Sequence, residues 1–398
     1  MKISLLGQFG SGNSGNDGSL EAMLIYLRKF RPDAQLVCIC SNPGVVSARY
    51  DVETIGIGGP TLSSRWARAV NRVFFKLPRR IALVLGSNLR LAGFDLMIVP
   101  GTGILDDFQE RAFGWPFVVF CWCLLARLCR TEIAFVSIGA GPIRGRLSRF
   151  FLRSAARMAS YRSYRDDFSL EFMRGIGIDV SRDRRYPDIA FTLPSPPAAL
   201  PPVSRLSIAV GVMNYRGWRI NDPRSDAIYE DYIGKISAFI RWLLEKGFRV
   251  SLLTGDATDR KALNEVVQRL SKEIGEDGSA QIEIATGASL HDIMSAMGKV
   301  DLAVVSRYHN LICALKQQRP TISLGYARKN DDLMGEYHQE RYCFHMETFK
   351  VENLKAAVEE LFENRLAIAQ RIKRSGDHWQ KQLLDQERFL NTRFLSKQ

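Results

Sequence analysis

The feature that most constrains the fold is an alternation of strand-like and helix-like segments that runs along the chain twice. In the first half, the apolar runs "KISLLG", "AQLVCIC", "FDLMIVPG" and "EIAFVSIGAGP" are separated by segments with helical periodicity, such as "SLEAMLIYLRKF". Parallel strands need crossover connections, which are usually helices. This order therefore predicts the α/β class, with a parallel sheet covered by helices.

The alternation restarts in the second half, with strand-like "RLSIAVGVM", "RVSLLTGD", "QIEIATG", "DLAVVS" and "PTISLGY". Between the halves lies "PSPPAALPPVS", residues 194–204, with five prolines, a composition typical of linkers. We predict two Rossmann-like βα domains, residues 1–193 and 205–350, that face each other across a cleft. Residues 351–398 show the amphipathic pattern of a helical segment.

Charge is spread unevenly over the 398 residues, whose net charge is +13. Residues 1–200 hold 26 basic and 16 acidic side chains, whereas the remainder holds 29 and 26. A basic half indicates an acidic partner, such as a membrane surface or a phosphorylated or acidic substrate. No dense Lys/Arg run is interleaved with aromatic residues, so nucleic acid is not expected as a partner.

The seven cysteines are scattered without the spacing of a zinc or redox pair, so we expect buried thiols, no metal and a cytoplasmic location. The longest apolar run, Trp115–Ala126, is shorter than the roughly 20 residues that span a bilayer. It predicts a buried helix, with a helix at a membrane interface as the alternative. The basic, apolar region from Arg65 to Arg130 leads us to expect peripheral contact with the inner membrane face.

The segment "DLAVVSRYHNLICAL", residues 301–315, sets an arginine and a histidine at a strand end. Ligands of open parallel sheets bind beyond the carboxyl ends of the strands, where helix N-termini present free N–H groups. Ser306 is expected to be the helix N-cap, which places Arg307 and His309 in the first turn. Arg307 offers a bidentate fork for phosphate or carboxylate, and His309 exchanges protons near neutral pH.

Two further strand ends carry polar groups. "SLGYARKND" is expected to place Tyr326, Arg328 and Lys329 on a loop after a strand, and "VGVMNYRGW" puts Asn214 and Arg216 after another. These side chains would converge on the same rim as Arg307 and His309. The set is therefore the candidate substrate-binding group of the second domain.

Three glycine-rich turns mark the first domain. The turn "GQFGSGNSGNDGS" contains Gly12, Asn13 and Asp17 but lacks the spacing of dinucleotide or phosphate-loop fingerprints. The turn "PGTGILDD" contains Gly101 and Gly103, and "SIGAGPIRG" follows a further strand. Three such rims favour a binding cleft. In "SYRDDFS", by contrast, Arg165 and Asp166 are interpreted as a local salt bridge at a helix start.

The order of these motifs resembles the polysaccharide pyruvyl transferase family. The matching pieces, from residue 7 to about 330, are "GQFGSGNSGND", "GTGILDD", "SIGAGPI", "SYRDDFS" with "PDIAF", "NYR", "SRYHNLICAL" and "SLGYARK". The resemblance implies a fold like that of two-domain, B-type glycosyltransferases. It also implies transfer of a pyruvyl group from phosphoenolpyruvate to a sugar of an exopolysaccharide or cell-surface glycan, commonly as a ketal, without a cofactor.

Carried over by residue, the resemblance implies that Arg307 and His309 hold phosphoenolpyruvate, with Arg216 and Lys329 as further anion contacts. Gly12, Asn13 and their neighbours would meet the acceptor, a glycan or lipid-linked oligosaccharide. The family usually has Gly-Asp after the Asn turn, whereas here Gly15 is followed by Asn16 and then Asp17.

The chemistry of the residues agrees with this family. Ketal formation requires a proton on the methylene carbon of the enol phosphate, for which His309 is suited as general acid. Arg307 would stabilise the departing phosphate, and Asp17 or Asp106 could act as the base. Two other functions stay open. One is a glycosyltransferase that uses a nucleotide sugar, with Asp256 on the ribose, and the other is a non-catalytic protein that binds anionic glycan or membrane.

Overall fold

The computed structural model describes residues 1–58, 93–108, 110–196, 206–219, 222–279, 281–285 and 289–396. Contacts divide the chain into two compact units. Unit 1 comprises Met1–Ser11, Ser19–Ile189 and Asp385–Gln398, and unit 2 comprises Gly12–Gly18 and Ala190–Leu384. Most of the expected linker, residues 197–204, lies outside the described residues, and the expected domain boundaries stay a prediction.

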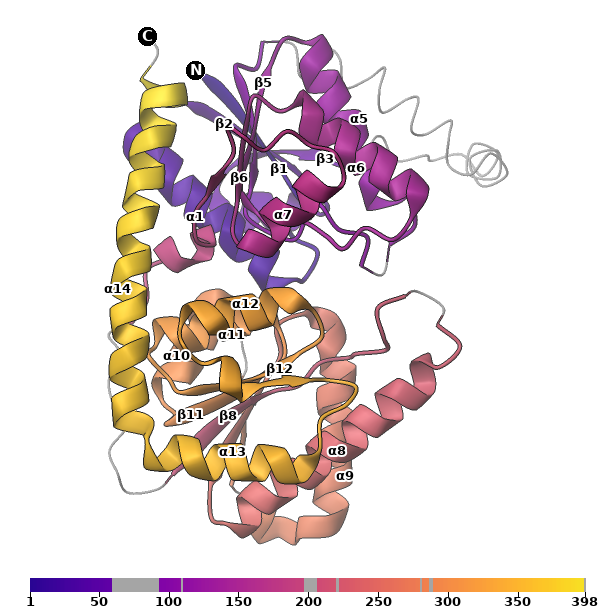
Figure 1. The fold of residues 1–398 in the computed structure, drawn as a ribbon, viewed down its shortest axis with the longest axis vertical. Coiled ribbons are helices and arrows are strands. Elements are labelled where there is room, and N and C mark those ends of the chain that lie inside the picture. Colours follow the sequence, from indigo (N-terminus) through magenta and orange to yellow (C-terminus); the bar gives the residue numbers. More distant parts are fainter. Residues whose placement is uncertain are drawn as a thin grey trace. The chain divides into compact units, whose positions relative to one another are not determined.

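Unit 1 is built on a parallel sheet of seven strands in the order β3-β2-β1-β4-β5-β6-β7 (Figure 1). The strands are β1 (Lys2–Leu6), β2 (Gln35–Cys40), β3 (Glu53–Gly56), β4 (Leu96–Pro100), β5 (Glu132–Ile138), β6 (Tyr161–Tyr164) and β7 (Arg184–Arg185). Their apolar runs are buried because helices cover the sheet. Four of these strands are the ones that the apolar runs of the first half predict.

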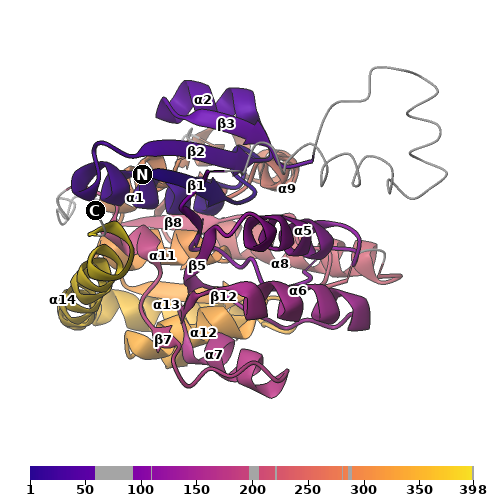
Figure 2. The same cartoon turned by 90° about the horizontal axis from the view of Figure 1, so that it is seen from above.

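The helices of unit 1 are α2 (Pro43–Tyr50), α5 (Trp115–Leu128), α6 (Arg146–Met158), α7 (Asp167–Gly175) and most of α1 (Ser14–Phe30). Figure 2 shows α5 and α6 beside each other. The predicted buried helix is α5, in which Trp122 and seven other side chains are buried. Trp122 belongs to the core that joins β4, β5 and α6.

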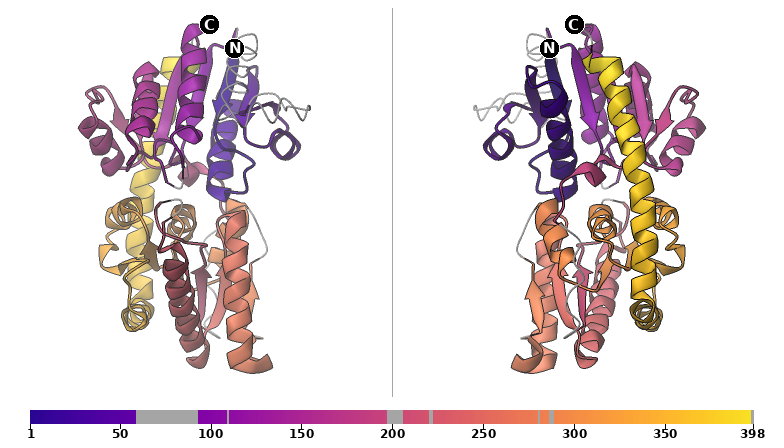
Figure 3. Two further views of the ribbon diagram at one scale, coloured as in Figure 1. Left: turned by 90° about the vertical axis from the view of Figure 1, so that its right-hand side faces the viewer. Right: turned by 90° about the vertical axis from the view of Figure 1, so that its left-hand side faces the viewer.

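Unit 2 repeats this plan with a parallel sheet of six strands in the order β10-β9-β8-β11-β12-β13. The strands are β8 (Ser207–Gly211), β9 (Arg249–Leu253), β10 (Ile282–Ile284), β11 (Leu302–Val305), β12 (Thr321–Gly325) and β13 (Cys343–His345). The α-helices are α8 (Ser225–Glu245), α9 (Arg260–Ser279), α10 (Leu290–Gly298), α11 (Tyr308–Lys316), α12 (Arg328–Glu336), α13 (Val351–Glu363) and most of α14 (Arg365–Leu390). Figure 3 shows each sheet with helices on its sides.

The C-terminal residues are helical, as their amphipathic pattern predicts. Within unit 2, Trp379 of α14 packs edge-on against Phe191 and Tyr337, with ring centroids 5.1 and 5.2 Å away. The last residues of α14 belong to unit 1, where the Gln386 amide donates to the hydroxyls of Ser137 and Ser163.

Three local expectations are wrong, all at helix starts. Helix α1 begins at Ser14, so the second half of the glycine-rich turn is helical and not a loop. Helix α11 begins at Tyr308 with Arg307 as N-cap residue, whereas the Ser306 hydroxyl donates to the Gly211 carbonyl. Helix α12 begins at Arg328, so Arg328 and Lys329 lie on a helix and not on the loop. In each case the local residue types predicted one start of the helix, and in the folded chain the helix starts at a different residue.

The α/β class with two parallel sheets is confirmed. All seven cysteines lie among the described residues outside any disulfide, and five of them are buried. Among the described residues, no helix has the length and apolar character needed to cross a membrane.

Candidate functional site

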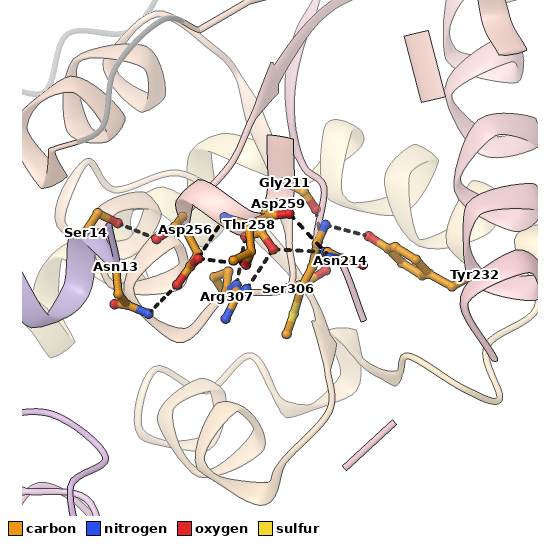
Figure 4. A network of polar contacts seen from close by, with 12 residues as sticks. Asn13, Ser14, Gly211, Asn214, Tyr232, Asp256, Thr258, Asp259, Ser306 and Arg307 are labelled. Carbon is orange, nitrogen blue, oxygen red and sulfur yellow. Dashed lines mark hydrogen bonds and ion pairs between the residues drawn. The ribbon is translucent and has the colours of Figure 1, made fainter. Parts of the chain in front are cut away.

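The centre of the candidate site is a buried carboxylate, Asp259, at the carboxyl edge of the sheet of unit 2. Its side chain is fully buried. Oδ1 accepts hydrogen bonds from the Asn214 backbone N–H (2.9 Å) and Nη2 of Arg307 (2.7 Å), and Oδ2 accepts one from Nε of Arg307 (2.9 Å). Figure 4 shows this network. Asp259 therefore fixes Arg307, which follows β11, against the loop that follows β8.

Arg307 is held as a cation by this arrangement. Its side chain is 16% exposed. Burial by itself lowers the pKa of Arg307, but the charge of Asp259 and its hydrogen bonds outweigh burial and raise that pKa above the ordinary value. Two of the five guanidinium N–H groups bind Asp259, so three are left for a ligand. The guanidinium is thus both charged and oriented.

The segment Gly12–Gly18 joins the same network from the far end of the sequence. The Asn13 amide donates to Oδ2 of Asp256 (3.0 Å), and the Ser14 hydroxyl donates to the Gly255 carbonyl (2.8 Å). The Gly12 carbonyl accepts a hydrogen bond from the Ala257 N–H (2.9 Å). Gly12 has a φ of +94°, and a Cβ there would lie 2.8 Å from that of Ala257, so glycine is required.

Asn13 also caps helix α1. Its Oδ1 accepts hydrogen bonds from the backbone N–H groups of Gly15 (3.1 Å) and Asn16 (3.2 Å). Asp17 lies in this first turn and is only 6% exposed. The structure therefore brings Gly12, Asn13 and Asp17 together on one short segment of unit 2.

His309 packs against this segment. A Cβ built on Gly15 would lie less than 3.0 Å from Nδ1 of His309. The Tyr308 ring lies perpendicular to the imidazole, with centroids 5.5 Å apart. Gly15 therefore provides the space that the imidazole occupies at the start of α11.

The neighbouring helix start carries the other predicted residues of this rim. Tyr326, at the end of β12, is buried, and its ring centroid lies 5.7 Å from that of Tyr215. Nζ of Lys329 lies 5.3 Å from the Tyr326 ring. The Asn330 amide donates to the Ser306 carbonyl (3.0 Å), which links α12 to the end of β11. Neither α11 nor α12 has a side-chain cap at its N-terminus.

Arg216 is placed differently from the other cations. It forms an ion pair with Asp226 of α8, and its Cζ lies 4.1 Å from the Tyr229 ring. Its neighbour Asn214 belongs to the Asp259 network, and the Asn214 Oδ1 is buried without a hydrogen-bond partner among the described residues.

The glycines of the second predicted rim lie in unit 1. Gly101 has a φ of +52°, and a Cβ there would lie 2.6 Å from the Ser19 hydroxyl. A Cβ on Gly103 would lie 3.0 Å from Oδ2 of Asp106, whose Oδ1 accepts the Phe108 N–H (3.1 Å). The contact and the positive φ explain why glycine is needed at Gly101, whereas at Gly103 a Cβ would make a tight contact with the Asp106 side chain.

A second buried ion pair lies in unit 1. Arg165 is 3.6 Å from Asp166, as the local interpretation expects, but its shorter contact is with Asp188 (2.8 Å). Asp166 caps α7 by accepting the Ser169 N–H (2.7 Å). The guanidinium lies where a Cβ on Gly139 would point. The pair therefore fixes the "SIGAG" turn to the "PDIAF" segment.

Sequence reasoning missed Asp259, the residue that organises the site. The motif "TGDATD" after β9 contains both Asp256 and Asp259, and the sequence-based prediction named Asp256. Asp256 instead binds Asn13 and caps a short 3-10 helix, Ala257–Asp259, by accepting the Thr258 N–H (2.9 Å). Across the described residues, no group of three or more His, Cys, Asp and Glu side chains could hold a metal ion.

Comparison with known families decides which family this arrangement belongs to. The family model described as polysaccharide pyruvyl transferase matches residues 13–328, a span that begins at Asn13 and ends at Arg328 of α12. The chain belongs to the polysaccharide pyruvyl transferase family. Members of this family act as transferases in polysaccharide biosynthesis, and the family implies a glycan acceptor. No curated protein matches the chain in sequence.

Solved structures share the fold of this family member. HepE from Anabaena in complex with UDP and glucose has a TM-score of 0.60 at 10% identity, over 100% of both chains. The UDP-GlcNAc 2-epimerase from Methanocaldococcus jannaschii has a TM-score of 0.59 at 12% identity, over 91% of this chain and 93% of its own. A glycosyltransferase from Rickettsia africae has a TM-score of 0.59 at 12% identity, over 100% and 99%. The expected likeness to the B-type glycosyltransferase fold is confirmed.

Proposed function

We propose that the protein transfers the pyruvyl group of phosphoenolpyruvate to two hydroxyls of a sugar, forming a ketal. One observation carries this proposal: a charged, oriented arginine and a histidine stand together at the start of α11, with the glycine-rich segment packed on the histidine. This arrangement suits a small substrate with two anionic groups and a carbon that must be protonated.

Binding of phosphoenolpyruvate requires several fixed donors, because the molecule carries both a phosphate and a carboxylate. Arg307 offers three N–H groups, and its charge is largely balanced by Asp259, so it would bind through directed hydrogen bonds more than net charge. The starts of α11 and α12 offer backbone N–H groups without side-chain caps. Lys329 adds a cation beside Tyr326.

In the proposed reaction, His309 donates a proton to the methylene carbon, which becomes the methyl group. The adjacent carbon is then attacked by one sugar hydroxyl, inorganic phosphate leaves, and a second hydroxyl closes the ketal. Of the two hydroxyl protons, one replaces the proton given by His309 and the other leaves with phosphate. Arg307 would stabilise the phosphate as it departs.

The acceptor would be a glycan or a lipid-linked oligosaccharide in the cytoplasm. Its hydroxyls could satisfy the buried Oδ1 of Asn214. Asp17, buried in the turn that packs on the histidine, is the better placed candidate for the base, since Asp106 lies in unit 1. Arg216 would bind an anionic group of the substrate only if its ion pair with Asp226 were broken. Gly101 and Gly103 remain candidates for the acceptor side.

The competing donor is a nucleotide sugar, because the structurally similar HepE from Anabaena was solved in complex with UDP and glucose. In that reading Asp256 would accept hydrogen bonds from a ribose. Its Oδ1 already accepts from the N–H and hydroxyl of Thr258, and its Oδ2 from Asn13. This engagement favours phosphoenolpyruvate as donor.

The test is release of inorganic phosphate from phosphoenolpyruvate by the full chain, with and without free and lipid-linked galactoside, mannoside and glucuronide acceptors. We expect release that depends on an acceptor and that falls by roughly 10²–10⁴-fold in His309→Ala. The matched control is His378→Ala, because His378 is an exposed residue of α14. Consumption of UDP-glucose in place of phosphoenolpyruvate would refute the proposal, as would binding of glycan without turnover.

A further inference from the structure

Two neighbouring helices of unit 1, α5 and α6, present an unusual number of apolar side chains to solvent. Nine large apolar side chains of the described chain are exposed, and four of them lie on these helices or directly beside them. They are Phe113, Leu128, Leu147 and Phe150, with exposed fractions of 46%, 64%, 41% and 57%. Figures 1 and 2 both show α5 and α6 side by side. We call this surface the α5–α6 face.

The phenylalanines of the α5–α6 face form one continuous aromatic cluster. The Phe151 ring lies 5.1 Å from that of Phe117, 5.4 Å from that of Phe120 and 5.6 Å from that of Phe150. Phe113 lies 5.7 Å from both Phe117 and Phe151. Phe151 is buried, so it anchors the more exposed rings to the core. The rings are therefore packed on one another and are not isolated side chains.

Arginines border this cluster. Helix α6 carries them at positions 146, 149, 153 and 157, a spacing that sets them along one stripe of the helix. Its buried residues, Ser148, Phe151, Leu152, Ala155 and Ala156, lie on another. Arg127 stands beside exposed Leu128 at the end of α5. Among the described residues, no carboxylate pairs with the arginines at positions 127, 146 and 149.

Sequence composition strengthens this charge pattern. From Arg111 to Arg165 the chain contains ten arginines and a single carboxylate, Glu132. Glu132 lies at the start of β5, beside Arg393, 3.5 Å away. The carboxylates of Asp107 and Glu110 bind backbone N–H groups at the starts of α6 and α5. The α5–α6 face thus combines exposed aromatic rings with the arginines at positions 127, 146 and 149, which have no carboxylate partner among the described residues. Such a combination fits a partner that is negative at its surface and apolar just beneath it.

We propose that the α5–α6 face docks the protein on a bilayer that contains anionic lipid. The helices would lie in the interface, with Phe113, Leu147, Phe150 and Leu128 at the level of the acyl chains and the arginines among the headgroups. A second copy of the chain fits this face less well, since a twofold contact would bring the two arginine stripes together. The proposal goes beyond the proposed transfer reaction and does not depend on it.

The test is sedimentation of the full-length protein with sucrose-loaded vesicles. One set is phosphatidylcholine alone, and the other includes phosphatidylglycerol as roughly a third of the lipid. We expect binding to the anionic vesicles only, weakening as salt rises because the contact is in part electrostatic. Each cation at an anionic surface contributes about fivefold in affinity, so R146Q/R149Q should weaken binding about thirtyfold.

Two further variants complete the design. F150S should weaken binding while the charge is unchanged, which separates insertion from simple attraction. R371Q/R374Q, which removes two exposed arginines from α14, is the matched control and should bind like the wild type. Thermal melts of all variants identify any that fail to fold.

These measurements test the membrane-docking proposal independently of any enzyme activity. Equal binding of wild type and R146Q/R149Q, or of neutral and anionic vesicles, would overturn it. Concentration-dependent dimers that F150S abolishes, without vesicle binding, would assign the α5–α6 face to a second copy instead.

Discussion

Replacing Asp259 by Asn tests the organisation of the candidate site most sharply. The substitution keeps the size of the side chain but removes the negative charge that accepts three hydrogen bonds. The Asn oxygen can still accept hydrogen bonds, whereas its amino group meets the N–H donors of Arg307 or Asn214. Arg307, 16% exposed, would then keep its charge but lose its hydrogen-bonded counter-ion, with the weaker influence of the Asp256 charge remaining.

The magnitude follows from this burial. Removing one partner of a buried ion pair costs about 3–5 kcal/mol, and the residual exposure of Arg307 points to the lower end. For a unit of this size, about 3 kcal/mol corresponds to a fall of about 6–12 °C in melting temperature. Because Arg307 would also lose the partner that orients it, the rate of phosphoenolpyruvate turnover should fall as well.

The assay is differential scanning calorimetry of the full chain, with Asp226→Asn as control. Asp226 is also paired with an arginine, Arg216, but its side chain is 91% exposed. The exposed pair is worth about 1 kcal/mol or less, so D226N should melt within a few degrees of the wild type. Equal melting temperatures for D259N and D226N would refute the reasoning.

Two further predictions concern residues that touch the site or its supporting helix. Gly15→Ala should displace His309 and lower turnover at least tenfold with little loss of stability. The control is Gly234→Ala in α8, where the added methyl group meets no atom within 4 Å and turnover should be unchanged. Unaltered kinetics in G15A would contradict the contact between Gly15 and His309. Burial lowers the pKa of Lys316 to about 8, with the opposing charge of Cys313 a smaller effect. Since an unfolded lysine titrates near 10.4, the unfolded chain binds more protons between these values, and stability from this group rises by about 2 kcal/mol from pH 8 to pH 10. Chemical denaturation of wild type and Lys316→Met across this range should show that rise in the wild type relative to the variant, and parallel curves would argue against a lowered pKa.

The strands were predictable from sequence because each is a short apolar run. A parallel strand that is buried on both faces requires no other local sequence signal. The helix starts were less predictable. Gly12, Gly15 and Gly18 disfavour a helix by propensity, yet α1 begins at Ser14 because Asn13 caps it while bound to Asp256. Local preference was overridden by a contact distant in sequence.

In the candidate site, too, some residues could be predicted from the sequence and others could not. Arg307 and His309 could be found because they follow an apolar strand, where parallel sheets bind ligands. Asp259 could not, because its importance comes from Arg307, which lies 48 residues further along the chain, after another strand. The partner of Arg216 was likewise hidden, since Asp226 lies on the following helix and carries no motif.

The measurement that tests the central claim most directly is mass spectrometry of the acceptor after incubation with enzyme and phosphoenolpyruvate. The account predicts an acceptor that gains the mass of one pyruvyl ketal, C₃H₂O₂, with one phosphate released per product, and no such product with His309→Ala. An acceptor left unmodified by phosphoenolpyruvate but extended by one hexose from a nucleotide sugar would contradict it.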